Sequence, residues 1–223
     1  MHAAETFVIT GTDTGVGKTH IACELLRGWR AQGQRVCGYK PVASGCVRTV
    51  EGLRNDDALA LQRAAGTNEP YDLINPYAFE PAIAPHLAAA QAGVTIETAR
   101  LDQAYAELHT RYDHVLIEGA GGWLVPLNEQ ITFADWIAAH DWPVILVVGM
   151  RLGCLNHALL SAQAITRRCR LLGWVANVVP PEMPVLQDNI IALERRMPAP
   201  RLALTDIPVR PAVPAGAESA GPG

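Results

Sequence analysis

Residues 11–19 read Gly11-Thr12-Asp13-Thr14-Gly15-Val16-Gly17-Lys18-Thr19, between the apolar run Phe7 to Ile9 and a helical pattern from Ile21 onward. A strand, a glycine-rich turn and a helix in this order are typical of a phosphate-binding loop, because small residues let backbone N–H groups surround phosphate oxygens. Lys18 would neutralise the β- and γ-phosphates, and the Thr19 hydroxyl would ligate Mg²⁺. The stretch therefore predicts a nucleoside triphosphate as ligand.

The spacing of this loop departs from the usual pattern. A glycine is expected five positions before Gly17, where Thr12 stands, and Gly11 lies one residue further back. The alternative is a glycine turn that joins a strand to a helix by chance. The strand before it and the helix after it favour a variant phosphate loop.

Short apolar runs alternate with helical patterns along the rest of the chain. This alternation predicts a doubly wound α/β fold of the P-loop NTPase type, with a mostly parallel sheet in a three-layer αβα arrangement. The expected strands are Phe7 to Thr10, Val36 to Tyr39, Val115 to Ile117, Val144 to Val148 and Trp174 to Val179. The expected helices are Lys18 to Gln32, Asp57 to Ala65, Ile96 to Arg111, Phe133 to His140, Asn156 to Arg168 and Val185 to Arg196, with Asn55, Thr132 and Asn156 as capping residues.

The domain organisation is expected to be simple, with one P-loop α/β domain over residues 1–210. Residues 211–223 are mostly Pro, Ala and Gly with a single charge, and predict a mobile tail. Pro70 to Pro85 holds four prolines and three aromatic residues and fits no helix period. We expect it to be an ordered connection across the carboxyl edge of the sheet, where loops often carry substrate contacts.

Composition excludes several classes of protein. The chain has 223 residues, 49% of them hydrophobic, and a net charge of −4 without any run of Lys or Arg, which argues against a nucleic-acid surface. Five cysteines form no Cys-x-x-Cys pair, so reduced thiols are expected. The first residues lack a basic segment and the apolar runs are only strand-length, which favours a soluble, cytoplasmic protein that contacts no membrane.

Polar residues at strand ends are the candidates for a ligand site, because ligands of open α/β sheets bind beyond the carboxyl ends of the strands. Besides the phosphate loop, these are Lys40, Glu118 and Asn177. We expect all of them to line one cleft. The histidines, His86 and His157 among them, show no metal-ligand spacing.

Two carboxylates could hold Mg²⁺. Glu118 ends a buried run, where P-loop proteins place an acidic residue that binds Mg²⁺ directly or through water. Its alternative role is to cap the loop that follows. Asp57 stands at the start of a helix and could bind the metal or simply cap that helix.

Three other polar residues each have an ordinary alternative. Lys40, held between a strand end and Pro41, would project into the phosphate cleft, although an isolated lysine is usually solvated at the surface. Ser44 alone would be a turn residue. The Asn177 amide could pair with adenine, or could bond its own backbone.

Several blocks in order resemble the dethiobiotin synthetase family, and the resemblance covers Gly11 to Pro208. The family's phosphate loop carries the same extra residue, which turns the unusual spacing into support. The matching blocks are Gly11 to Thr19, Gly38-Tyr39-Lys40-Pro41-Val42-Ala43-Ser44-Gly45, Arg54-Asn55-Asp56-Asp57-Ala58-Leu59, Glu118-Gly119-Ala120-Gly121-Gly122-Trp123, Gly153-Cys154-Leu155-Asn156-His157 and Gly173-Trp174-Val175-Ala176-Asn177.

The resemblance implies a role for each matching residue. Lys18 and Lys40 would be catalytic, and Thr19, Asp57 and Glu118 would surround Mg²⁺. The nucleotide would contact Gly15, Val16, Gly17, Lys18, Thr19, His20, Asp57, Glu118, Gly119, Ala120, Gly121, Asn177 and Pro208, the last two flanking adenine. The substrate would contact Thr14, Lys40, Ser44, Pro81, Leu152, Gly153, Cys154 and Asn156.

The implied activity is that of a ligase (cyclo-ligase) of biotin biosynthesis. One amine of 7,8-diaminononanoate (7,8-diaminopelargonate) adds to CO₂, the carbamate takes the γ-phosphoryl group of ATP, and the second amine closes the ring with release of phosphate. Lys40 would stabilise the carbamate and the γ-phosphate together, and its charge would disfavour protonated substrate amines. The family also implies a homodimer in which the segment from Leu152 to Asn156 reaches the carboxylate end of the substrate across the interface.

A second interpretation is a switch ATPase of the chromosome-partitioning or septum-positioning type. Those proteins carry a signature lysine early in the loop, where this chain has Asp13. The chain also lacks a basic DNA surface and a terminal amphipathic helix.

Overall fold

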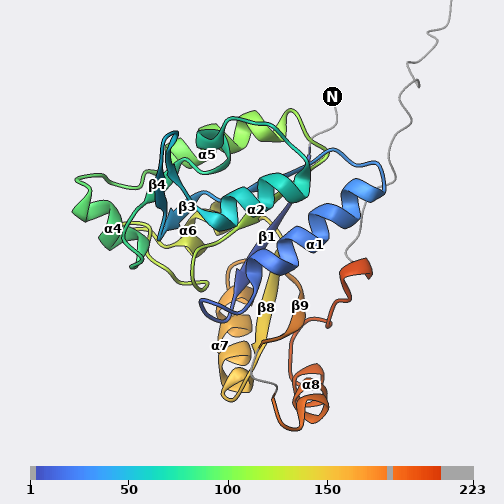
Figure 1. Cartoon of the computed structure of the whole chain (residues 1–223). Helices are drawn as coiled ribbons and strands as arrows, with labels where there is room; N and C mark the ends of the chain where they lie inside the picture. Colours follow the sequence, from blue (N-terminus) through green and yellow to red (C-terminus); the bar gives the residue numbers. More distant parts are fainter. Residues whose placement is uncertain (1–3, 180–182, 207–223) are drawn as a thin grey trace, which may run out of the picture.

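A parallel five-stranded sheet forms the centre of this computed structural model, which describes residues 4–179 and 183–206. The strand order is β2-β7-β1-β8-β9, and every neighbouring pair is parallel. Figure 1 shows the sheet with helices around it. The strands are β1 (Glu5–Gly11), β2 (Val36–Tyr39), β7 (His114–Glu118), β8 (Val144–Met150) and β9 (Leu171–Val178).

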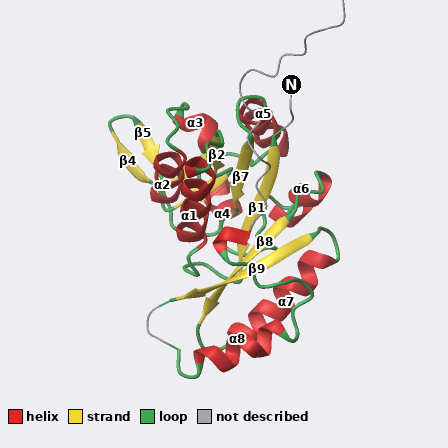
Figure 2. Cartoon of the chain, turned by 90° about the vertical axis from the view of Figure 1, so that its right-hand side faces the viewer, coloured by secondary structure: helices red, strands yellow, loops and turns green. Residues whose placement is uncertain are grey.

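Helices cover both faces of the sheet, and the side chains of successive strand residues pack alternately into two apolar clusters. Val8, Val115 and Leu146 belong to one apolar cluster, whereas Phe7 and Ile9 belong to the other. Figure 2 shows α1 and α2 on one side of the strands and α6 and α7 on the other. The helices are α1 (Lys18–Ala31), α2 (Asp56–Ala65), α3 (Tyr71–Ile74), α4 (Pro85–Gln91), α5 (Thr98–His109), α6 (Phe133–Ala139), α7 (Cys154–Thr166) and α8 (Leu186–Glu194), with a 3₁₀ turn at η1 (Leu204–Asp206).

The predicted doubly wound fold is confirmed, and all five expected strands lie in the sheet. The last strand starts at Leu171 rather than at Trp174. The strand ends at Val178, so Asn177 is its second-last residue, at the strand end where it was expected. Leu171 is buried and Leu172 packs against the core, so the strand extends backwards as far as its side chains find partners.

Two of the three predicted caps are confirmed. The Asn55 side chain accepts hydrogen bonds from the backbone of Asp57 and Ala58, and Thr132 forms a capping box with Asp135. The prediction for Asn156 is wrong. Helix α7 begins two residues earlier, after a glycine at φ 93° that turns the chain into the helix without any side-chain cap.

The connection from Pro70 to Pro85 was expected to contain no helix, and this is wrong in detail. It contains the single turn α3 and the three-residue strand β6 (Tyr77–Phe79), and Pro85 begins α4. Strand β6 pairs in parallel with β3 (Val42–Ser44), while β4 (Val47–Thr49) and β5 (Gly52–Arg54) form a small hairpin. Elements of three or four residues are too short to show a period.

The carboxyl ends of β1, β2, β7 and β8 lie at one edge of the sheet because the strands are parallel. The phosphate loop, Lys40 and Glu118 therefore meet there. Pro208 and residues 211–223 lie outside the described residues, and the domain division at residue 210 stays a prediction. Of the helices described, none has both the length and the apolar character that a bilayer span requires.

Candidate functional site

The phosphate loop runs from the end of β1 to the start of α1. Gly17 precedes the helix at φ 90°, with no side chain capping the helix. The first N–H groups of α1 are thus free of a side-chain acceptor, which makes this end an anion site. A Cβ on Gly17 would lie 2.0 Å from Asn177 Nδ2, so any other residue there would have to displace the Asn177 side chain.

Lys18 is buried at the base of the loop. Its ammonium donates to the Asp13 backbone oxygen at 2.9 Å, and the Asp13 carboxylate pairs with Arg151 at 2.5 Å. Burial and the nearby Lys40 charge lower the pKa of Lys18 to about 8, against the opposing pull of Glu118 and Asp57. The negative charge of a bound phosphate group would raise the pKa of Lys18 again and stabilise its ammonium form.

Lys40 is buried between two carboxylates at the end of β2. Its Nζ lies 2.7 Å from Glu118 Oε1 and 3.0 Å from Asp57 Oδ2. Burial opposes the charged form, but the two carboxylates outweigh it and raise the pKa of Lys40. The alternative of a solvated surface lysine is therefore wrong, and the site holds a fixed cation.

Glu118 ends β7 with its side chain fully buried. Oε1 accepts from Lys40 and also from the Thr19 hydroxyl at 2.8 Å. Oε2 is buried and has no hydrogen-bond partner within the described part of the chain. The carboxylate thus has an unused oxygen beside the phosphate loop.

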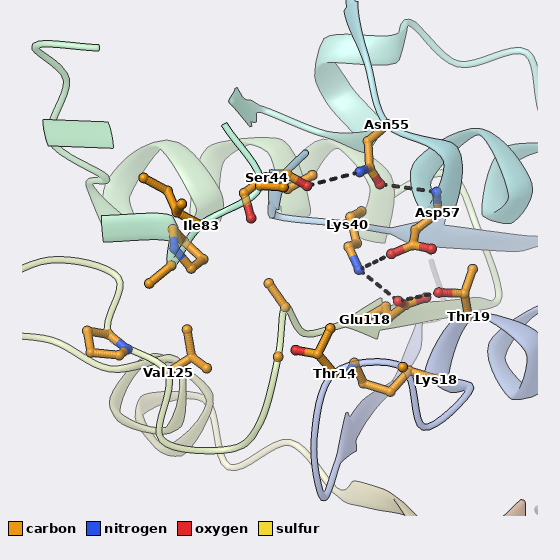
Figure 3. Close-up of a pocket in the computed structure, with 18 of the residues that line it drawn as sticks. Thr14, Lys18, Thr19, Lys40, Ser44, Asn55, Asp57, Ile83, Glu118 and Val125 are labelled. Carbon is orange, nitrogen blue, oxygen red and sulfur yellow. Dashed lines mark hydrogen bonds and ion pairs between the residues drawn. The ribbon is translucent and has the colours of Figure 1, made fainter. Parts of the chain in front are cut away.

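Asp57 stands in the first turn of α2, but Asn55 caps that helix, so Asp57 is left for another role. Burial would raise its pKa, yet Lys40, Thr19 and Lys18 together lower it. Its carboxylate is therefore ionised, half-exposed and directed toward Lys40. Figure 3 shows Asp57, Lys40, Glu118 and Thr19 gathered at one end of the cleft.

These oxygens fit a hard cation that is shared with phosphate. The Thr19 hydroxyl, the ionised Asp57 and the unused Glu118 oxygen are ligand types that Mg²⁺ accepts alongside water and phosphate. Among the described residues, no group of three or more His, Cys, Asp or Glu side chains could hold a metal by itself. Water and phosphate oxygens would complete the coordination of a cation here.

The cleft above these residues has a volume of about 830 Å³ and two chemically different ends. Ile83 and Val125 stand at the end away from Lys40, with Thr14 and Ser44 between (Figure 3). The lining residues are Thr14, Gly15, Gly17, Lys18, Thr19, Lys40, Ala43, Ser44, Asn55, Asp57, Ala82, Ile83, Ala84, Pro85, Glu118, Ala120, Gly121, Val125 and Pro126. The arrangement suits a ligand that is anionic at one end and apolar beyond it.

Other candidate residues lie next to the cleft rather than in its wall. Val16 is buried in the core, and its backbone oxygen accepts from Asn177 Nδ2 at 2.8 Å. Asn177 thus lies against the phosphate loop and is not among the lining residues, contrary to the expectation. The Gly119 oxygen accepts from Lys40 at 3.4 Å, and Pro81 directly precedes the lining residue Ala82.

The candidates at the start of α7 are not among the residues that line the cleft of this chain. Leu152 is 96% exposed, and Gly153 and Asn156 are also exposed. Cys154 is buried in the core, so only its backbone is available to a substrate. His20 is exposed on the first turn of α1.

The sequence did not predict the apolar part of the cleft wall. Ala43, Ile83, Val125 and Pro126 line the cleft, yet they are ordinary loop and strand-end residues without a motif. Asn55 was recognised only as a cap, although it also lines the cleft. Pro70 to Pro85 was expected to carry substrate contacts, and its last four residues do reach the site.

Comparison with known proteins gives relatives over most of the chain. A family model described as an AAA domain matches residues 5–215. An ATP-dependent dethiobiotin synthetase from Xylella fastidiosa (strain 9a5c) is 50% identical over 195 residues, 87% of this chain and 86% of the relative. The enzyme of the same name from Pseudomonas paraeruginosa is 52% identical over 198 residues, covering 88% and 87%.

Solved structures with the same fold are much more distant in sequence. A ParA family ATPase from Chlorobium tepidum is 16% identical with a TM-score of 0.52, over 90% of this chain and 82% of that one. The septum site-determining protein MinD from Pyrococcus horikoshii is 15% identical with a TM-score of 0.53, over 90% and 80%. At such identity the likeness shows the fold alone.

Proposed function

Because this chain belongs to the family of ATP-dependent dethiobiotin synthetases, we propose that it closes the ureido ring of dethiobiotin from 7,8-diaminononanoate, CO₂ and ATP. Such a reaction makes the chain a cyclo-ligase. The observation that carries the proposal is the buried Lys40 ammonium between Glu118 and Asp57, at the end of a cleft that also contains the phosphate loop.

The reaction forms two C–N bonds and releases one phosphate. The first amine adds to CO₂ and loses a proton, which gives a carbamate. A carbamate oxygen attacks the γ-phosphorus, and ADP leaves. The second amine attacks the carbonyl carbon of this mixed anhydride, phosphate departs with the carbamate oxygen, and the amine proton is lost as the ring closes.

The chain's own cations hold the charge that moves in these steps. The backbone N–H groups of Gly15 to Thr19 and the Lys18 ammonium would surround the phosphates. Lys40 would contact the carbamate and the γ-phosphate together, because it is fixed beside the loop by its two carboxylates. Bound Mg²⁺, held by Thr19, Asp57 and Glu118, would supply further charge neutralisation.

The remaining nucleotide contacts come from residues around the loop. Val16, His20, Gly119, Ala120 and Gly121 would contribute along the phosphates and ribose. Asn177 keeps one amide hydrogen and its carbonyl oxygen after bonding the Val16 oxygen, so it retains what adenine recognition needs. Pro208 would pack on the other side of the base.

The diamine would occupy the other part of the cleft. Thr14 and Ser44 lie between Lys40 and the apolar end of the cleft, and the apolar wall after Pro81 suits an alkyl chain. Its carboxylate would reach the start of α7, Leu152 to Asn156, in a second copy of the chain. That segment is exposed apart from the buried Cys154 side chain and the half-buried Leu155, as a surface between two copies of a homodimer would be in one copy alone.

We also propose a cytoplasmic location for the protein. All five cysteines are buried free thiols, which suits a reducing compartment.

The test is an assay of the purified protein with Mg-ATP, bicarbonate and the diamine. We expect phosphate release and cyclic urea formation in equal amounts, with both lost when the diamine is omitted. Phosphate release that is unaffected by omitting the diamine would instead support the switch ATPase.

A further inference from the structure

The hydroxyl of Tyr71, the first residue of α3, lies between two separate segments behind the cleft. It accepts a hydrogen bond from the Asn55 backbone N–H at 2.7 Å and donates to Asn75 Oδ1 at 2.9 Å. The Arg54 guanidinium lies over the Tyr71 ring, 4.3 Å from its centre, and forms a cation–π contact with it. One phenol therefore connects the residues just before α2 to those just after α3.

The Asn75 end of this connection leads to Lys40. Asn75 is buried, and its Nδ2 donates to the Lys40 backbone oxygen at 2.7 Å and to the Tyr77 oxygen at 3.1 Å. The Lys40 backbone N–H in turn donates to the Ile74 oxygen at 2.9 Å. Both backbone groups of Lys40 are thus fixed by the segment that carries Asn75.

The Asn55 end leads to Asp57. Asn55 Oδ1 accepts from the backbone N–H groups of Asp57 at 3.1 Å and Ala58 at 3.3 Å, and so sets the first turn of α2. Asn55 Nδ2 also lies 3.5 Å from the Ser44 oxygen. The position of Asp57 therefore depends on the residue that Tyr71 holds.

We propose that Tyr71 is a positioning residue for the reaction, because its hydroxyl fixes the end of β2 against the start of α2 and so brings the Lys40 ammonium to the Asp57 carboxylate. The inference rests on the proposed function. Tyr71 is not among the residues that line the cleft, so it acts through Lys40 and Asp57 and not on the substrate. Burial raises its pKa to about 12, which keeps the phenol a neutral donor during turnover.

The change Tyr71→Phe removes this hydroxyl and leaves the ring in place. We expect kcat to fall about tenfold, because small displacements of fixed catalytic charges slow phosphoryl transfer. The KM for ATP should stay within about twofold of the wild-type value, because the loop that surrounds the phosphates connects β1 to α1 and, within the described residues, has no hydrogen bond to Tyr71. Steady-state kinetics well below the unfolding temperature measure both.

Tyr112→Phe is the matched control. The Tyr112 hydroxyl also has two hydrogen-bond partners, the Thr67 hydroxyl at 2.6 Å and the Glu69 carboxylate at 2.9 Å, and burial likewise raises its pKa to about 12. None of these residues lines the cleft. Both variants should lose a similar amount of thermal stability, while only Tyr71→Phe should lower kcat.

Two outcomes overturn the inference while the proposed function stands. One is a Tyr71→Phe enzyme with wild-type kcat, and the other is an equal loss of kcat in both variants, which would indicate general destabilisation. A wild-type protein that forms no cyclic urea would overturn the proposed function and this inference with it.

Discussion

Lys40 and Glu118 form a buried ion pair, and Lys40 depends on its carboxylate partners for its charge. A lysine this deeply buried stays protonated only because two carboxylates outweigh the cost of burial. Glu118 is equally deprived of water. A substitution at either residue of this pair should therefore change both the activity and the stability of the protein.

We predict that Lys40→Met lowers kcat by about 10² to 10³-fold, the usual cost of removing one charge-stabilising group from such a site. It should also lower the free energy of unfolding by roughly 3 kcal/mol, because Glu118 is left buried without its cation. Kinetics and urea unfolding measure the two effects.

The double variant Lys40→Met/Glu118→Gln separates these effects. It should regain stability and remain inactive. Full turnover with only a raised KM in Lys40→Met would refute the catalytic role of Lys40.

The pKa of Lys18, about 8, predicts a pH dependence of ATP binding. Lys18 in the free protein loses its proton as pH rises through 8, and bound phosphate restores that proton. The association constant for ATP should therefore fall above pH 8, by up to about tenfold per pH unit, with uptake of one proton. Calorimetric titration in buffers of different ionisation enthalpy measures the uptake.

Lys18→Arg provides the control, because arginine stays protonated throughout this pH range. Its proton uptake at pH 9 should vanish. Unchanged uptake in this variant would assign the titration to another group.

At the scale of the elements, the phosphate loop depends on two glycines with positive φ, only one of which is crowded. A Cβ on Gly17 would clash with Asn177 Nδ2 at 2.0 Å, whereas a Cβ on Gly15 would meet no atom within 4 Å. The backbone conformations are otherwise similar, at φ 90° and 73°.

We therefore predict that Gly17→Ala weakens ATP binding at least about tenfold more than Gly15→Ala does. Both variants pay for a left-handed alanine, about 1 kcal/mol, but only Gly17→Ala must also displace the Asn177 side chain from its hydrogen bond with the Val16 oxygen. Fluorescence titration with a nucleotide analogue compares them. Equal affinities of the two variants would show that the crowding of Gly17 by Asn177 does not affect ATP binding.

How far sequence predicts an element depends on its length and signals. Helix α6 was predicted almost to the residue, because Thr132 is a cap and the apolar period is clear. Helix α4 was not predicted at all: it is seven residues long and begins after Ala84 without a side-chain cap. Helix α7 was misplaced because the residue that starts it is Gly153, whose role depends on backbone conformation.

Across the whole molecule, sequence predicts the features that local motifs encode, but not the contacts between segments far apart in the chain. The fold and the residues Lys18, Thr19, Lys40 and Glu118 follow from motifs at the ends of strands, and Asp57 follows from its place at the start of a helix. The structure brings these five residues together. The apolar wall near Ile83 and the contact of Asn177 with Val16 join segments far apart in sequence. No local pattern records such contacts.

The proposed homodimer yields a prediction at the same scale. Leu160 on α7 is 57% exposed, next to the segment proposed to reach the partner's substrate. Leu160→Glu should shift the protein toward monomers and raise the KM for the diamine, because a buried carboxylate opposes association. Sedimentation velocity and kinetics measure the two effects.

Val50→Glu is the matched control, since Val50 is fully exposed in the turn between β4 and β5. It should leave both quantities unchanged. A Leu160→Glu protein that sediments and turns over as the wild type does would place the interface elsewhere.

In the proposed reaction, this P-loop site phosphorylates a carbamate rather than activating water. The most direct measurement is the fate of oxygen from ¹⁸O-labelled CO₂ during a short reaction with ATP and the diamine. If a carbamate oxygen attacks the γ-phosphorus, the released phosphate must carry one ¹⁸O atom for each ring closed. Phosphate that instead takes its new oxygen from the solvent would show that water, and not a carbamate, attacks the γ-phosphorus.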